Sequence, residues 1–205
     1  ADFQLRLADI GLFTPEFRGP LTAYGTARQQ GVTWSVDVSA TGPGGTQADI
    51  AGTASTSGNL NLNVDGSAPL GLINGLLEPR RLSGLANFNL RINGPAALNA
   101  VSGTITTTNA ALSAPTLGQS LNSINARITL GGGSADITLT GQSGQGGQIS
   151  VGGRVGLSGN YPANLNIGLQ EIVLRDPLLY ETTASGQVTL NGGLTGGAVI
   201  GGVVN

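Results

Sequence analysis

The chain has 205 residues, of which 39 % are hydrophobic and only 10 % are charged, with a formal net charge of −2. Its nine basic residues, all arginine, are scattered along the sequence, which argues against nucleic acid as a partner, since nucleic acid requires a clustered basic surface. The absence of His and Cys excludes Ser–His and Cys–His catalytic couples, imidazole or thiolate metal ligands, and disulfides.

One short phrase recurs along the chain: an apolar residue, any residue, an apolar residue, any residue, and then Gly. Because side chains in a β-strand alternate between two faces, each copy predicts a strand with one apolar face, ended by a Gly at which the chain can turn. The intervening residues are mostly small and polar, which predicts a hydrated opposite face. The copies are Leu62-Val64-Gly66, Leu90-Ile92-Gly94, Ile128-Leu130-Gly132, Ile137-Leu139-Gly141, Val155-Leu157-Gly159 and Val188-Leu190-Gly192.

Predicted strands follow one another along almost the whole chain. Short turns rich in Gly, Ser, Asn and Gln join several of them, such as residues 131–133 and 144–147, which is typical of antiparallel hairpins. No stretch reaches the roughly 20 apolar residues of a membrane helix. The alternating segments are residues 3–7, 32–38, 48–52, 60–64, 85–92, 101–105, 124–130, 135–139, 149–155, 165–169, 184–190 and 198–204.

One segment departs from the strand period. Ser67 is a good N-cap, Pro69 suits a first helical turn, and the apolar residues at positions 70, 73, 76 and 77 share one helical face. Pro79 follows and ends the pattern. The sequence therefore predicts one short amphipathic helix near residues 68–77, which we expect to lie across the apolar sheet face or to close one end of it.

The copies of the phrase are unevenly spaced, which disfavours a solenoid of fixed period and suits an antiparallel meander. A closed β-sandwich would also use such strands. An outer-membrane barrel would require aromatic girdles, but aromatic residues make up only 4 % of the chain. We expect a single elongated all-β domain over residues 1–205: a long antiparallel sheet curled into an open hydrophobic trough. Small residues at inward positions suggest room inside it, namely Gly103, Ala126, Ala135, Gly153 and Ala184.

Such a trough has a clear use. Keeping an acyl chain out of water is worth about 0.8 kcal/mol per CH₂ group, so a continuous apolar lining can carry lipid. The residues expected to line it are Val36, Val38, Leu60, Leu62, Val64, Phe88, Leu90, Ile92, Ile105, Ile124, Ile128, Leu130, Ile137, Leu139, Ile149, Val151, Val155, Leu165, Ile167, Leu169, Val188 and Leu190.

Residues suited to other chemistry are few. Glu171, Asp176 and Glu181 would offer the paired carboxylates of glycoside hydrolysis, but Asp176 precedes Pro177 in a turn pattern, which favours solvated side chains. The pair Arg80-Arg81 would hold an anionic headgroup, or would complement the dipole at the end of the predicted helix. The acidic residues are spread out, so we expect no metal, no cofactor and no enzymatic activity.

Several motifs, in their order along the chain, resemble one family: the C-terminal domain of TamB, a component of the translocation and assembly module among the AsmA-like, bridge-type lipid-transfer proteins. The resemblance extends from about Leu60 onward. It rests on residues 82–88 (LSGLANF), 115–118 (PTLG), 124–128 (INARI), 146–149 (GGQI), 174–180 (LRDPLLY), 184–188 (ASGQV) and 197–202 (GAVIGG).

The resemblance implies a "β-taco", a curled sheet with a hydrophobic interior. It implies a periplasmic protein anchored in the inner membrane, a TamA-like outer-membrane barrel as partner, phospholipid as cargo, and a role in assembling autotransporters and other outer-membrane proteins. Both ends of the sequence lie within apolar alternation, so we expect a fragment of a longer chain that lacks the anchor. Two alternatives stay open: a chaperone-like scaffold that binds unfolded outer-membrane strands by β-augmentation, and an inert structural or adhesive β-sandwich.

Overall fold

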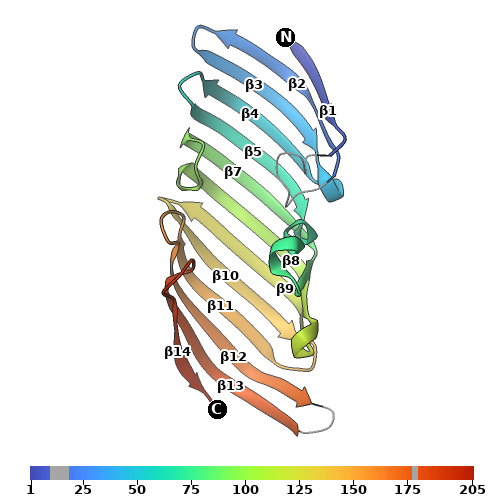
Figure 1. Ribbon diagram of the computed structural model, residues 1–205, viewed down its shortest axis with the longest axis vertical. Coiled ribbons are helices and arrows are strands. Elements are labelled where there is room, and N and C mark those ends of the chain that lie inside the picture. The colour runs from blue at the N-terminus through green and yellow to red at the C-terminus, as the bar shows by residue number, and fades with distance from the viewer. Residues whose placement is uncertain (10–18, 177–179) are drawn as a thin grey trace.

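A computed structural model describes residues 1–9, 19–176 and 180–205. Most of them belong to one antiparallel sheet, which is drawn in Figure 1 with its strands stacked along the long axis of the molecule. The strands are β1 (Asp2–Leu7), β2 (Leu21–Gln30), β3 (Thr33–Thr41), β4 (Gln47–Ser55), β5 (Asn59–Pro69), β6 (Arg81–Ser83), β7 (Leu85–Pro95), β8 (Val101–Ala114), β9 (Gln119–Gly131), β10 (Ser134–Ser143), β11 (Gln148–Gly156), β12 (Pro162–Asp176), β13 (Tyr180–Gly193) and β14 (Val199–Val204).

The sheet is 14-stranded, and its strands are hydrogen-bonded in chain order from β1 to β14. The one departure is β6, which pairs with the far end of β8 and continues the line of β7. This order confirms the predicted antiparallel meander and the all-β class. β1 and β14 form the two edges and do not pair with each other, so the sheet is not closed into a barrel.

Strand β2 is the main element that the alternation pattern missed. Its residues on the apolar face include Ala23, Gly25 and Ala27, which pair with residues of β3 along the register. These residues are too small to produce a strong hydrophobic signal in the sequence. Ala23 is nevertheless only 7 % exposed, between Leu5 of β1 and Ala40 of β3 in the register.

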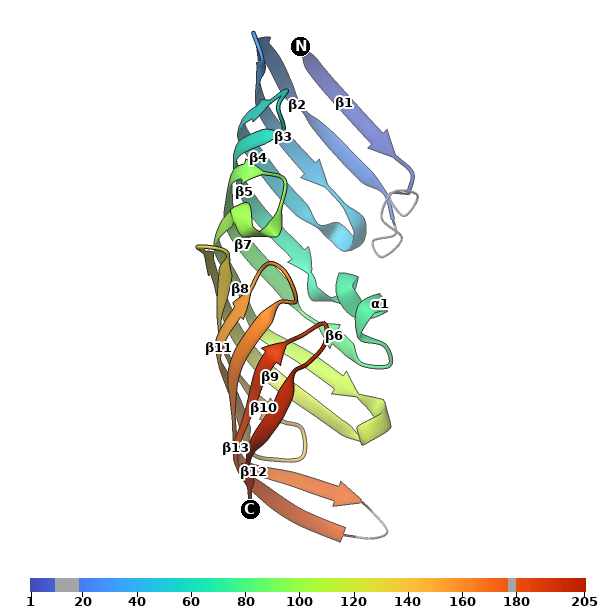
Figure 2. The same cartoon turned by 60° about the vertical axis from the view of Figure 1, so that its left-hand side comes forward.

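The expected short helix is present, but it begins later than predicted. A 3₁₀ turn, η3 (Leu70–Ile73), leads into a single α-helical turn, α1 (Asn74–Leu77), and neither has a side-chain cap. Ser67 is not the N-cap because it still belongs to β5, where it pairs with Asn87 of β7. Figure 2 shows α1 projecting from the sheet beside β6. The other 3₁₀ turns are η2 (Pro43–Gly45), η4 (Leu98–Ala100) and η5 (Pro115–Leu117).

The expectation that each repeated phrase ends at its Gly is only partly confirmed. Gly132 and Gly159 lie in turns. The prediction is wrong for the remaining copies, whose glycines lie inside strands β5, β7, β10 and β13. Gly66 shows the reason: a Cβ atom there would lie 2.1 Å from the backbone oxygen of Gln47 on β4. Glycine at this position lets the neighbouring strand approach while the strand itself continues.

The interior of the molecule is unusual for a domain of this size. Within the described residues, no large side chain is fully buried, and the buried hydrophobic positions are mostly alanines. Neither a second sheet nor a layer of helices packs over the described strands, although domains normally bury a sheet face against a second layer. The two-sheet sandwich kept open by the sequence is therefore not formed. The buried hydrophobic residues are Ala23, Ala86, Ala110, Ala114, Ile124, Ala135, Val155 and Ala163.

Candidate functional site: the apolar face of the sheet

One face of the sheet carries the alternating apolar residues, and we call it the apolar face. The pairing register joins residues of successive strands into rows across this face, because directly opposed residues of antiparallel strands point to the same side. One row, which we call the central row, crosses the sheet from β1 to β14. It consists of Leu5, Ala23, Ala40, Ala48, Gly66, Phe88, Ile105, Ile128, Ile137, Gly153, Leu165, Leu190 and Ile200.

The register places all the residues predicted to line a trough on this one face. The central row contains Phe88, Ile105, Ile128, Ile137, Leu165 and Leu190. A second row contains Val38, Val64, Leu90, Leu130 and Val155, a third Leu139, Val151, Ile167 and Val188, and a fourth Val36, Leu62 and Ile92. Leu60 pairs with Gly94, Ile149 with Leu169, and Ile124 with Ala110.

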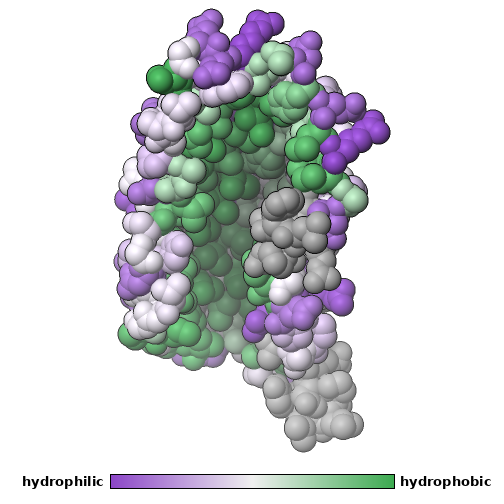
Figure 3. Space-filling model, turned by 45° about the horizontal axis from the view of Figure 1, so that its top comes forward, coloured by the Kyte–Doolittle hydropathy of each residue, from purple (hydrophilic) through white to green (hydrophobic). Residues whose placement is uncertain are grey.

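Exposure follows the same alternation. In β5 the side chains of Leu60, Leu62 and Val64 are half-buried, whereas the intervening Asn61 and Asn63 are exposed. The other predicted lining residues are half-buried as well, apart from Ile124 and Val155, which are buried. Figure 3 shows hydrophobic residues running along one face of the molecule, with hydrophilic residues at its margins. The apolar side chains pack sideways against one another and remain partly accessible from the front.

Small residues on this face have a local steric role that the sequence did not reveal. At Gly153 a Cβ atom would lie 2.1 Å from the backbone oxygen of Asn164 on β12. Ala135 is 5 % exposed and lies between Leu130 and Val155 in the register. These positions allow close approach of the strands rather than simply leaving free space, which corrects the reason for which the sequence singled them out.

The predicted list of lining residues also leaves out some residues of the apolar face. Ile50 lies between Val38 and Val64 in the second row. Leu112 and Leu174 lie beyond bulges, where the pairing of β8 with β9 and of β12 with β13 shifts register. A bulge changes which residues share a face, so simple alternation along the sequence could not assign them.

The opposite face, which we call the polar face, is held by contacts between neighbouring strands. The Arg154 guanidinium donates from Nε to Asp136 Oδ1 at 2.7 Å and from Nη2 to Oδ2 at 3.0 Å. This pair, chiefly through its hydrogen bond, lowers the pKa of Asp136 below its ordinary value. Between β7 and β5, Arg91 donates to Asn63 Oδ1 at 3.2 Å. Polar side chains thus find partners within the face or in water.

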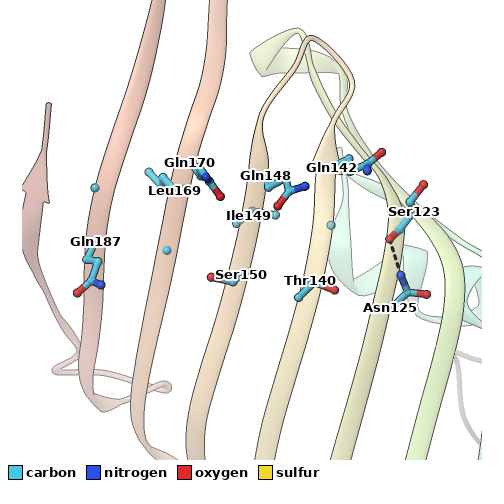
Figure 4. Close-up of a pocket in the computed structure, with 13 residues that line it drawn as sticks. Ser123, Asn125, Thr140, Gln142, Gln148, Ile149, Ser150, Leu169, Gln170 and Gln187 are labelled. Carbon is cyan, nitrogen blue, oxygen red and sulfur yellow. Dashed lines mark hydrogen bonds between the residues drawn. The ribbon is translucent and has the colours of Figure 1, made fainter.

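Two hollows of different character lie near the C-terminal half of the sheet. The larger, about 520 Å³, is lined mainly by amide and hydroxyl groups of strands β9 to β13. Figure 4 shows Gln142, Gln148, Gln170 and Gln187 around it, together with Ser150 and Thr140. The smaller, about 250 Å³, is almost wholly apolar and is lined mainly by β8, β9, β11 and β12. Of these two hollows, the smaller has the surface chemistry of a hydrocarbon site.

Glu171 and Glu181, two of the carboxylates weighed for glycoside chemistry, are not brought together as a pair; the side chain of the third, Asp176, lies outside the described part of the structure. Glu171 lies at the bulge of β12, whereas Glu181 of β13 is in register with Arg175. The four-residue offset along β12 corresponds to about 13 Å, beyond the roughly 5–9.5 Å separation of such catalytic pairs.

Among the described residues, none of the helices has the length and hydrophobicity needed to span a membrane.

Comparison of the chain with known protein families, with characterised proteins and with solved structures gives no match. The resemblance to the TamB C-terminal domain family therefore stays a prediction that rests on the motifs alone. What the described residues provide is a single open sheet with alternating apolar residues on one face and no second sheet packed over its strands.

Proposed function

We propose that the apolar face lines an open hydrophobic trough that carries the acyl chains of lipids. The central row carries this proposal, because it joins apolar or small residues from β1 to β14 without a charged residue. The curvature of the sheet in Figure 2 and the continuous hydrophobic surface in Figure 3 support it. Soluble proteins rarely leave so extended an apolar surface uncovered unless it binds something.

The size of the hydrophobic effect makes acyl chains a suitable cargo. A chain of about 16 carbons loses on the order of 12 kcal/mol when it is fully exposed to water. A face of repeated Val, Leu and Ile residues recovers part of this free energy at every position along the sheet. Because successive rows are chemically alike, no position holds the chain much more tightly than the next, and a lipid can therefore move along the face.

In the cell, this function corresponds to one section of a bridge between the inner and outer membranes. The family resemblance places that section in the periplasm, with phospholipid as cargo and a TamA-like barrel at the outer-membrane end, where autotransporters and other outer-membrane proteins are assembled. On this proposal the protein is a conduit and not an enzyme. These assignments depend on the resemblance, whereas the acyl-chain proposal depends on the apolar face.

A second candidate function is supported by the edge strand β14. Four of its residues, Val199, Ile200, Val203 and Val204, are between 50 % and 71 % exposed, and the strand carries no charged residue. Unprotected, uncharged edge strands readily accept another strand. A scaffold that holds unfolded outer-membrane strands by β-augmentation would use this edge, whereas a lipid conduit uses the face.

Site-specific photo-crosslinking followed by mass spectrometry tests the conduit proposal. A photoreactive amino acid is placed at Ile137, Leu165 or Ile167 on the apolar face, and at Thr138 as the matched control. Thr138 adjoins Ile137 but points to the exposed polar face. We expect lipid adducts at the three apolar positions and few at Thr138. Equal adduct yields at Ile137 and Thr138 would refute the proposal, and adducts to peptide instead of lipid would favour the scaffold.

A further inference from the structure

The smaller, apolar hollow on the C-terminal half of the sheet has a distinctive border. Its wall consists of hydrocarbon side chains from β8, β9, β11 and β12, which converge where the strands pass their bulges. They are Leu112, Leu121, Ile149, Leu169, Ile172 and Leu174. Together they enclose about 250 Å³, a volume that holds only a segment of an acyl chain and leaves the rest of the lipid to extend along the apolar face.

Four residues with polar side chains also line this hollow, although its surface is almost wholly apolar. Arg80, Gln119, Ser120 and Ser143 contribute to its lining. Arg80 lies between α1 and β6, and its backbone N–H donates to the Leu77 oxygen at 2.8 Å. Within the described residues, the Arg80 guanidinium makes no ion pair and no side-chain hydrogen bond.

We propose that this hollow is a docking position for an anionic amphiphile, with the acyl chain against the leucine and isoleucine wall and the anionic headgroup at Arg80. The inference rests on the proposed lipid function and adds to it the class of lipid. A guanidinium is a planar donor that matches carboxylate and phosphate oxygens. No carboxylate belongs to the lining of the hollow, so an anionic headgroup meets no like charge there.

The neighbouring arginine provides a matched control. Arg81 is also exposed, but it begins β6, pairs in register with Ser113, and does not line the hollow. Arg80→Gln and Arg81→Gln change the net charge of the protein by the same amount. A difference between the two variants therefore reports the position of the charge rather than its sum.

The test uses native mass spectrometry of the chain with an equimolar mixture of oleoyl lysophosphatidylglycerol and oleoyl lysophosphatidylcholine. These lipids share the tail and differ in headgroup charge. We expect wild type to prefer the anionic lipid by about 1.5- to 5-fold, the range of an exposed charge pair. The Arg80→Gln variant should lose this preference while keeping total lipid occupancy, and Arg81→Gln should retain it.

Each contrary outcome has a distinct meaning. Retained preference in Arg80→Gln, or equal loss in Arg81→Gln, would overturn the docking position and leave the conduit intact. If inorganic phosphate alone displaced the anionic lipid at millimolar concentration, the site would recognise an anion without its tail, which also overturns the proposal. If neither lipid bound to wild type, the proposed lipid function itself would fail.

Discussion

The same strands form both faces of the sheet. The polar side chains on one face have partners, whereas the apolar side chains on the other remain partly exposed. On the polar face, Asn89 of β7 donates to Asp65 of β5, and Arg91 donates to Asn63. Leu90 lies between Asn89 and Arg91 in sequence but points to the apolar face, where it is half-buried. It has neighbouring strands on both sides, but among the described residues no second layer covers it. The polar groups are satisfied by each other and by water, whereas the apolar face still exposes hydrocarbon that a ligand can cover.

The pairing of strands within the sheet is therefore separable from the packing of a second layer against one of its faces. The backbone ladder and the sideways contacts hold the sheet together without a second layer. A change that prevents close approach of the strands should therefore damage stability, whereas a polar change at a half-buried position of the apolar face should damage binding more than folding.

Gly153→Val should cause the largest loss of stability. A side chain there meets the Asn164 backbone oxygen of β12, so the strands must separate, and strain of this kind costs about 1–3 kcal/mol or more. The adjacent Gly152→Val is the control, because a Cβ atom at Gly152 meets nothing within 4 Å. The urea midpoint of unfolding checks both variants. Equal shifts for the two would show that the glycines are not needed for strand approach.

Leu139→Asp should reduce lipid binding strongly while leaving the protein folded. A carboxylate placed against an acyl chain loses hydration at a cost of a few kcal/mol, so we expect at least about a five-fold loss of bound lipid. Thr138→Asp, on the exposed polar face of the same strand, should bind lipid as wild type does. Circular dichroism monitors folding alongside a lipid-binding assay. Unfolding of Leu139→Asp would indicate a packed core at this position rather than an accessible surface.

The pair of Asp136 and Arg154 should give the smallest effect, a weak pH dependence of stability. Because Arg154 lowers the pKa of Asp136 from its ordinary value of 3.8, the pair stabilises the fold above that value, and the contribution is lost as the pH falls through the lowered pKa of the folded state. A double-mutant cycle of Asp136→Asn and Arg154→Gln should show a small coupling at pH 7 and none in strong acid. Coupling that is independent of pH would contradict this assignment.

Membership of the two faces could be predicted from the sequence because it depends on local alternation. Ile137 and Leu139 are two residues apart in one strand, so they lie on the same face of the sheet whichever strands pair with it. The structure places them as expected. Strand β2 was missed because Ala23 and Gly25 give little hydrophobic signal. The hollow beside Arg80 could not be predicted from the sequence. Arg80, in the turn after α1, and Leu174, near the end of β12, line the same hollow only because the pairing of the strands is bulged.

The most direct test of the central claim, that acyl chains lie along the apolar face, is methyl NMR with a spin-labelled fatty acid. If acyl chains lie along the apolar face, we expect strong paramagnetic broadening of the methyl signals of Ile105, Ile137 and Leu190 in the central row. Leu85 and Val203 serve as internal controls, because they are 46 % and 68 % exposed but alternate onto the polar face. Their signals should stay sharp. Equal broadening of Leu85, Val203 and the central row would contradict the account.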